Sequence, residues 1–284
     1  MSDNPSFVLK DILDVEIQQK PVPESESTKG QIHARLLIVL SCEVDANEII
    51  SGKYRATGCY RMEPLSVAVH AVSNLGALLS NQSVAVFGCG PVGLLCMALA
   101  KALGASRIIA EDIIPDRLEF VKTYAVTDTF LPPSMDKGAS GVAFSIRNAQ
   151  EMKEKLGIAE HGPRAIDLVL NASGAEASIQ TGIRIAKSGG TFVQVTAMSP
   201  LTCLLSLCKE LVVRGSLRYG PGDYPLAIAL VASGKVDVKS LVSHRFPFRQ
   251  ACEAFEITRI GKSPDGKGII KVMISGPDVD INEV

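Results

Sequence analysis

The sequence predicts an α/β fold built around a doubly wound parallel sheet. Three observations predict it. Strand-like and helix-like segments alternate over residues 83–217, the strand-like segments are continuous apolar runs, and a glycine-rich turn joins the first strand to a long helix. Strands of a parallel sheet have such runs because helices cover both of its faces. The alternation favours right-handed crossovers within one sheet.

The expected elements follow one another along the chain. We expect strands at 83–87, 107–110, 166–171, 191–195, 212–217, 244–248 and 269–274, and helices at 92–103, 116–124, 175–186 and 249–260. Turn residues separate the last helix from the last strand. We interpret residues 70–215 as a nucleotide-binding domain. Residues 1–69 and 216–284 together form a smaller domain into which it is inserted.

The composition is that of a globular protein. Of 284 residues, 46% are hydrophobic and 21% are charged, and the formal net charge is -1. The hydrophobic content excludes a chain that is disordered throughout. The net charge argues against general electrostatic binding to nucleic acid or to an anionic membrane. We expect neither a membrane span nor a signal peptide. The 7 cysteines form no CxxC pair, which predicts reduced thiols and a cytoplasmic location.

A G-x-G-x-x-G motif that begins at Gly88 carries the strongest functional signal. The first predicted strand runs into it, and the first predicted helix leaves it. Gly88 allows a tight turn, Gly90 lets the backbone approach a pyrophosphate, and Gly93 lets helix and strand pack closely. Pro91 suits the first helical turn, and the free N–H groups at the helix start, around Val92, attract phosphate. Dinucleotide binding is the prediction, and an ordinary glycine turn is the alternative.

An acidic pair ends the second strand, about 20 residues after the loop, where a ribose-binding acid belongs. Glu111 and Asp112 are both candidates. A carboxylate at this position accepts hydrogen bonds from the ribose hydroxyls and repels the 2′-phosphate of NADP. The pair therefore predicts NAD as the cofactor.

Several segments resemble the sorbitol and xylitol (polyol) dehydrogenase branch of the medium-chain dehydrogenase/reductase superfamily. The resemblance runs from Met62 to about Met273. Its carriers are EPLSVAVH at 63–70, the glycine loop, NASGAEASIQ at 171–180, LRY at 217–219 and LVSHRFP at 241–247. Together these motifs are specific to the branch.

The resemblance implies a Rossmann domain inserted in a GroES-like β domain. It also implies NAD-dependent oxidation of a secondary alcohol of a sugar alcohol, of xylitol or sorbitol type, to the ketose. For the cofactor it implies Asp112 at the ribose, Arg117 beside the adenosine, and Ser173, Val195 and Thr196 beside the nicotinamide. Family members pair through the edge of the Rossmann sheet, so self-association is implied too.

For catalysis, the resemblance implies a zinc ion bound by Cys42 and Glu63, with Arg218 orienting the polyol. A catalytic zinc takes about three protein ligands and keeps one open position, from which it activates the alcohol. The family's Gly-His-Glu motif is absent from the chain, and only residues 48–62 separate Asn47 from Glu63. Most of the family's N-terminal catalytic domain is therefore missing.

Two alternatives follow from this departure. One is an NAD-binding paralogue that lacks a complete zinc site and is inactive or altered in activity. The other is a zinc-independent medium-chain reductase. Cys59 and His70 are further candidate ligands, although the family has a histidine at the position of His70 that binds no metal.

Overall fold

The structure is a computed structural model that describes residues 5–11, 14–19, 56–135, 140–195, 209–261, 263–264 and 268–275. The chain divides into two compact units. One contains Arg61–Lys239, and the other contains Met1–Tyr60 and Ser240–Val284. The first unit holds the whole predicted nucleotide-binding range, 70–215, and extends beyond it at both ends.

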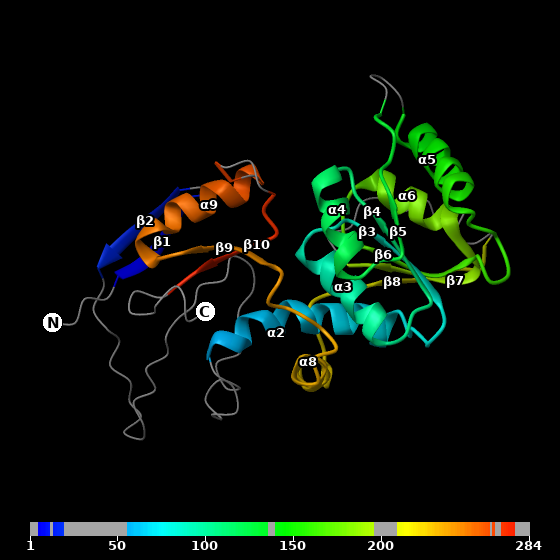
Figure 1. The fold of residues 1–284 in the computed structure, drawn as a ribbon. Helices are drawn as coiled ribbons and strands as arrows, with labels where there is room; N and C mark the ends of the chain where they lie inside the picture. Colours follow the sequence, from blue (N-terminus) through cyan, green and yellow to red (C-terminus); the bar gives the residue numbers. More distant parts are fainter. Residues whose placement is uncertain are drawn as a thin grey trace. The chain divides into compact units, whose positions relative to one another are not determined.

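A six-stranded parallel sheet forms the centre of the larger unit (Figure 1). Its strands are β3 (Ser83–Phe87), β4 (Arg107–Glu111), β5 (Asp128–Phe130), β6 (Ile166–Asn171), β7 (Ala186–Gln194) and β8 (Val212–Gly215). Across the sheet they lie in the order β5-β4-β3-β6-β7-β8, and all neighbours are parallel. The order reverses between β3 and β6. Sheets of this kind bind ligands at the carboxyl ends of the strands beside such a reversal.

Helices cover both faces of this sheet. They are α3 (Pro91–Ala102), α4 (Pro115–Tyr124), α5 (Gly141–Leu156) and α6 (Glu176–Ile185). Figure 1 shows α3 and α4 on one side of the strands and α5 and α6 on the other. On the α5–α6 side, Phe87, Val169 and Phe192 pack against Met152 and Ile183 in a fully buried apolar cluster. Burial on both faces explains why these strands read as continuous apolar runs.

Two further helical segments complete the larger unit. The first is α2 (Ala56–Val69), which belongs to this unit from Arg61 onward and continues directly into η1 (His70–Leu75), a turn of π-helix that packs against α3. The second, α8 (Asp223–Ala232), follows β8. A π-turn widens the helix by one residue per turn, and such turns occur often at functional sites.

The smaller unit contains two pairs of strands. The antiparallel pair is β1 (Pro5–Asp11) with β2 (Asp14–Gln19), and the parallel pair is β9 (Val242–Phe246) with β10 (Lys271–Ile274). Between β9 and β10 the chain forms η2 (Phe248–Gln250) and α9 (Ala251–Ile260). A small apolar cluster forms its core, made of Ala251, Ala254, Ile257, Ile269, Val272 and Ile274.

The predicted fold class is confirmed, and the expected strands and helices are present with shifted ends. The predicted elements do not include α2, β5 or α8, and of α5 the sequence predicts only a solvated helix face at 153–155. The strand β5 has only 3 residues, and α5 is a charged surface helix whose apolar face is narrow. Within the described ranges, no helix is both long and apolar enough to cross a membrane.

Candidate dinucleotide-binding site

The glycine loop after β3 is fixed by close packing at two of its three glycines. Gly88 has a φ of 95°, a left-handed conformation that side chains rarely adopt, and a Cβ there would lie 2.9 Å from the Ser173 nitrogen. A Cβ at Gly93 would lie 1.8 Å from the Gly88 carbonyl oxygen. Gly90 differs, because no atom lies within 4 Å of its would-be Cβ. The first and third glycines therefore serve packing, and the second leaves open space above the loop.

The start of α3 presents its backbone N–H groups at this open space. Gly90 is the N-cap residue, Pro91 occupies the first helical turn, and the first helical bond runs from Leu94 N–H to the Gly90 carbonyl. The N–H groups before Leu94 have no partner within the helix. They can donate to a phosphate, which the helix dipole also attracts.

Asp112 connects this loop to the end of β4. Its carboxylate is 5% exposed. Oδ2 accepts the Cys89 N–H at 2.7 Å, and Oδ1 accepts the Ile114 N–H at 2.8 Å. The guanidinium of Arg117 lies 3.7 Å from Oδ2. A carboxylate has about four acceptor positions, so the backbone occupies about half of them.

Glu111 is buried at the end of β4, in register with Phe87 of β3 and Phe130 of β5. Burial, together with the neighbouring charge of Asp112, raises the pKa of its carboxyl to about 8. Burial likewise raises the pKa of the Cys89 thiol in the loop. At neutral pH the Glu111 carboxyl, beside Asp112, is therefore largely protonated.

The carboxyl ends of β6 and β7 complete the site on the other side of the switch point. Asn171 Oδ1 accepts the backbone N–H of Ser173 at 3.0 Å and its hydroxyl at 2.8 Å. Val195 N–H donates to the Asn171 carbonyl at 2.9 Å. The Asn171 amide nitrogen is buried and has no hydrogen-bond partner among the described residues. A buried donor without an acceptor costs about 1–3 kcal/mol, which a ligand oxygen would offset.

These contacts bring most of the predicted cofactor residues to one edge of the sheet. Gly88 to Gly93, Asp112, Arg117, Ser173 and Val195 all follow the carboxyl ends of β3, β4, β6 and β7. Thr196 lies outside the described residues. The open loop, the α3 N-terminus and the unpartnered Asn171 donor fit a bound dinucleotide.

The residues predicted for catalysis are placed only in part. Glu63 is buried in α2, and Arg218 is exposed after β8 with a left-handed φ of 53°. Cys42 lies outside the described residues. Within the part of the chain that the structure describes, no group of three or more His, Cys, Asp or Glu could hold a metal ion. Cys42 and Glu63 alone fall short of the donor set that a catalytic zinc requires.

Comparison with models of protein families shows to which family this chain belongs. A family model described as "Zinc-binding dehydrogenase" matches residues 91–233, just over half of the chain. The chain belongs to this family. The resemblance to the medium-chain polyol dehydrogenases is thereby confirmed.

Relatives and solved structures agree with this placement. D-xylulose reductase A of Aspergillus niger is 46% identical over 220 residues, which are 76% of this chain and 56% of the relative. L-idonate 5-dehydrogenase of Escherichia coli superposes with a TM-score of 0.60 at 25% identity, covering 75% of this chain and 55% of that structure. Galactitol-1-phosphate dehydrogenase of Escherichia coli gives 0.61 at 25% identity, covering 78% and 61%. The chain thus spans a little over half the length of these relatives.

Sequence reasoning missed two features of this site. Asn171 ends an apolar strand with a polar residue, which is the signal that could have identified its buried amide. Glu111 was considered only as a rival to Asp112. Its burial follows from strand alternation, because it is two residues from Ile109 on the face that carries the apolar cluster.

Alanine substitutions at two loop glycines separate packing from ligand binding. Gly93→Ala places a Cβ against the Gly88 carbonyl, so we expect a lower thermal unfolding midpoint and loss of NADH binding. Gly90→Ala has room for its methyl group, so we expect an unchanged midpoint but NADH affinity lower by about tenfold or more, because the methyl fills the phosphate approach. Calorimetry and fluorescence titration measure the two effects. If the two variants had the same unfolding midpoint and the same NADH affinity, this division of roles would be contradicted.

Glu111 predicts a pH dependence of stability. Its folded-state pKa, about 8, lies above its ordinary value of 4.5. Its contribution is therefore fully present below about pH 4.5 and is lost as the pH rises towards 8. Glu111→Gln cannot ionise, so its unfolding midpoint should exceed that of wild type at pH 8 and approach it at pH 5. The difference in unfolding free energy is on the order of a few kcal/mol at most.

The control is Glu119→Gln, a substitution at an exposed position on α4. It should leave the pH profile of the unfolding midpoint as in wild type. A Glu111→Gln profile parallel to that of wild type between pH 5 and 8 would show that Glu111 does not titrate in this way.

Proposed function

We propose that this protein is an NAD-dependent oxidoreductase of the polyol dehydrogenase type. Its reaction would oxidise a secondary alcohol of a sugar alcohol, such as xylitol or sorbitol, to the ketose. NAD, when bound, would accept the hydride of the carbinol carbon, and the hydroxyl proton would be released to solvent. The family membership supports the reaction class, and the similarity to D-xylulose reductase A supports the substrate class.

The geometry of Asp112 is the observation that carries the cofactor assignment. Two backbone N–H groups fix its carboxylate at the end of β4, and about two acceptor positions stay available for the ribose hydroxyls. The same negative charge disfavours a 2′-phosphate. Arg117 could attract such a phosphate, but its guanidinium already lies beside Asp112. This arrangement supports NAD over NADP.

Other residues of the chain would bind and orient the same cofactor. The N-terminus of α3 donates N–H groups to the pyrophosphate, above Gly90. On the nicotinamide side, the buried Asn171 amide, Ser173 and Val195 line the carboxyl ends of β6 and β7. NAD, when bound, supplies the hydride acceptor. The chain supplies its position and excludes water from the buried strand ends.

Arg218 is proposed to orient the polyol. It is exposed, and it lies in the segment that follows β8. A guanidinium donates several hydrogen bonds in a fixed geometry, which suits neighbouring hydroxyl groups of a sugar alcohol. Cys42 and Glu63 remain the proposed zinc ligands. Because they do not complete a zinc site, the proposal assigns no step to the metal.

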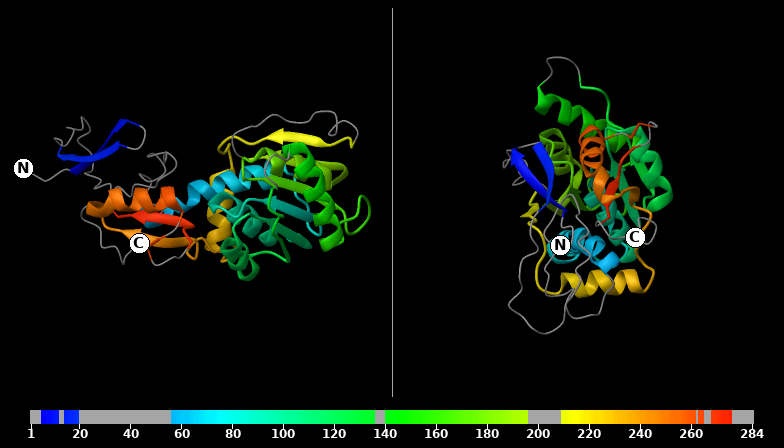
Figure 2. Two further views of the ribbon diagram at one scale, coloured as in Figure 1. Left: turned by 90° about the horizontal axis from the view of Figure 1, so that it is seen from above. Right: turned by 90° about the vertical axis from the view of Figure 1, so that its left-hand side faces the viewer.

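Two further proposals concern assembly and location. The strand β8 forms one edge of the sheet, visible in yellow in Figure 2, and all four of its residues are exposed. An exposed apolar edge strand can pair with another strand, so we propose a second copy of this chain as its partner. The free thiols of Cys89 and Cys96, both buried, support a cytoplasmic location.

The test is the formation of NADH when the purified protein is mixed with NAD and xylitol or sorbitol. Wild type should oxidise the polyol. Arg218→Ala should lower kcat/KM for the polyol by about tenfold to a hundredfold, the range expected when a charged hydrogen bond is lost. The affinity for NADH, measured by fluorescence, should not change.

Arg164→Ala, at an exposed arginine in the loop after α5, is the matched control and should behave as wild type. NADH binding without polyol oxidation would contradict the proposed activity and favour an NAD-binding protein of another role. Tighter binding of NADPH than of NADH would favour a zinc-independent reductase.

A further inference from the structure

A buried carboxylate joins the π-turn to the segment that carries Arg218. Asp223, the first residue of α8, has a side chain that is only 1% exposed. Its Oδ2 lies 3.1 Å from His70 Nδ1, and its Oδ1 accepts a hydrogen bond from Asn74 Nδ2 at 2.8 Å. A carboxylate accepts hydrogen bonds, so we assign the proton of the first contact to His70 Nδ1, which also lies 3.5 Å from Asn74 Nδ2. Both donors come from η1.

The same carboxylate holds the backbone of the turn before α8. Gly220 N–H donates to Asp223 Oδ2 at 2.6 Å. On the other side of Arg218, Ser216 N–H donates to the Gln194 carbonyl at 2.7 Å, which ties the chain to β7. Arg218 thus lies between two anchored backbone positions, each two residues away.

Arg218 itself has an unfavourable backbone conformation. Its φ of 53° is left-handed, which costs free energy for a residue with a side chain. Such a conformation persists only where the surrounding structure holds it, and it occurs often in residues that act on ligands. The two anchors supply that restraint.

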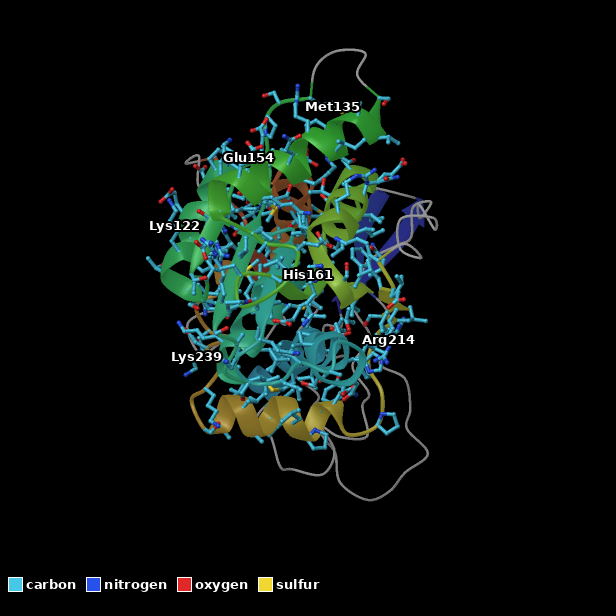
Figure 3. All side chains as sticks on the ribbon, turned by 90° about the vertical axis from the view of Figure 1, so that its right-hand side faces the viewer. Lys122, Met135, Glu154, His161, Arg214 and Lys239 are labelled. Carbon is cyan, nitrogen blue, oxygen red and sulfur yellow. The ribbon has the colours of Figure 1, made fainter. Side chains whose placement is uncertain are left out.

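Two more contacts brace the segment. The rings of Tyr219 and Tyr224 meet edge to face, with centroids 4.9 Å apart. Arg214 of β8, labelled in Figure 3, donates from Nη1 to the Leu75 carbonyl at the end of η1 at 2.6 Å. The π-turn therefore contacts the segment 214–223 at both of its ends.

We propose that His70 and Asn74, through Asp223, position Arg218 for recognition of the polyol. The inference rests on the proposed function, because it takes the polyol as the ligand of Arg218. The three residues are positioning residues, since none of them needs to touch the substrate. In this account the histidine serves the substrate site without binding metal.

A double-mutant cycle of His70→Ala and Arg218→Ala tests the proposal. The measured quantity is KM for the polyol. His70→Ala should raise KM for the polyol about fivefold to tenfold and leave KM for NAD unchanged. His70→Asn should restore most of the affinity, because the asparagine Nδ2 can donate from the position of His70 Nδ1. In the Arg218→Ala background, His70→Ala should change little, because the residue that it positions is already gone. His161→Ala, in the exposed loop labelled in Figure 3, is the histidine control.

A second readout does not depend on activity. Trypsin should cleave slowly after Arg218 in wild type and at least about fivefold faster in His70→Ala, because the released turn opens locally. Cleavage after Lys155 in α5 should keep its rate. Mass spectrometry identifies the two cleavage sites.

The outcomes separate this inference from the proposed function. Suppose that wild type oxidises polyols. The positioning role is then overturned if His70→Ala raises KM for the polyol and KM for NAD equally. It is also overturned if the effects of His70→Ala and Arg218→Ala on polyol KM are additive. If wild type oxidises no polyol, the proposed function fails. In that case, unchanged trypsin cleavage overturns the restraint as well, whereas faster cleavage supports the restraint and overturns only its link to a polyol.

Discussion

The hydrogen bond from Cys89 N–H to the Asp112 carboxylate is the interaction on which the site depends. It joins the turn after β3 to the end of β4, so one carboxylate fixes the glycine loop and lies where we propose that the ribose binds. Glu111, beside it, is held largely protonated by burial. Two ionised acids at this position would repel each other, so the protonated Glu111 lowers the negative charge beside the loop.

Close packing makes this arrangement possible. The chain of α3 passes so near the Gly88 carbonyl that only glycine fits at position 93. Its N-terminus is thereby held at the switch point of the sheet, at the carboxyl ends of the neighbouring strands β3 and β6. The residues of the candidate dinucleotide site therefore lie together in one unit, although the chain spans a little over half the length of its relatives. The proposed polyol site depends instead on the segment after β8 and on its contacts with η1.

Much of this could be predicted from the sequence, because the signals are local. The glycine motif, the acidic pair and the apolar strands each occupy a few consecutive residues. The contact between His70 and Asp223 has no local signal, since 153 residues separate them. The π-turn was equally hidden, because helix periodicity does not distinguish it from α-helix. Cys42 and Thr196 lie outside the described residues, so their roles stay predictions.

The most direct test of the account compares the dissociation constants of NADH and NADPH for the wild-type protein at pH 7, in one buffer of fixed ionic strength. An Asp112 carboxylate held at the ribose position predicts that NADH binds at least about tenfold more tightly, because the 2′-phosphate meets a fixed negative charge. Equal affinities, or a preference for NADPH, would contradict the role assigned to Asp112 and the cofactor proposal that depends on it.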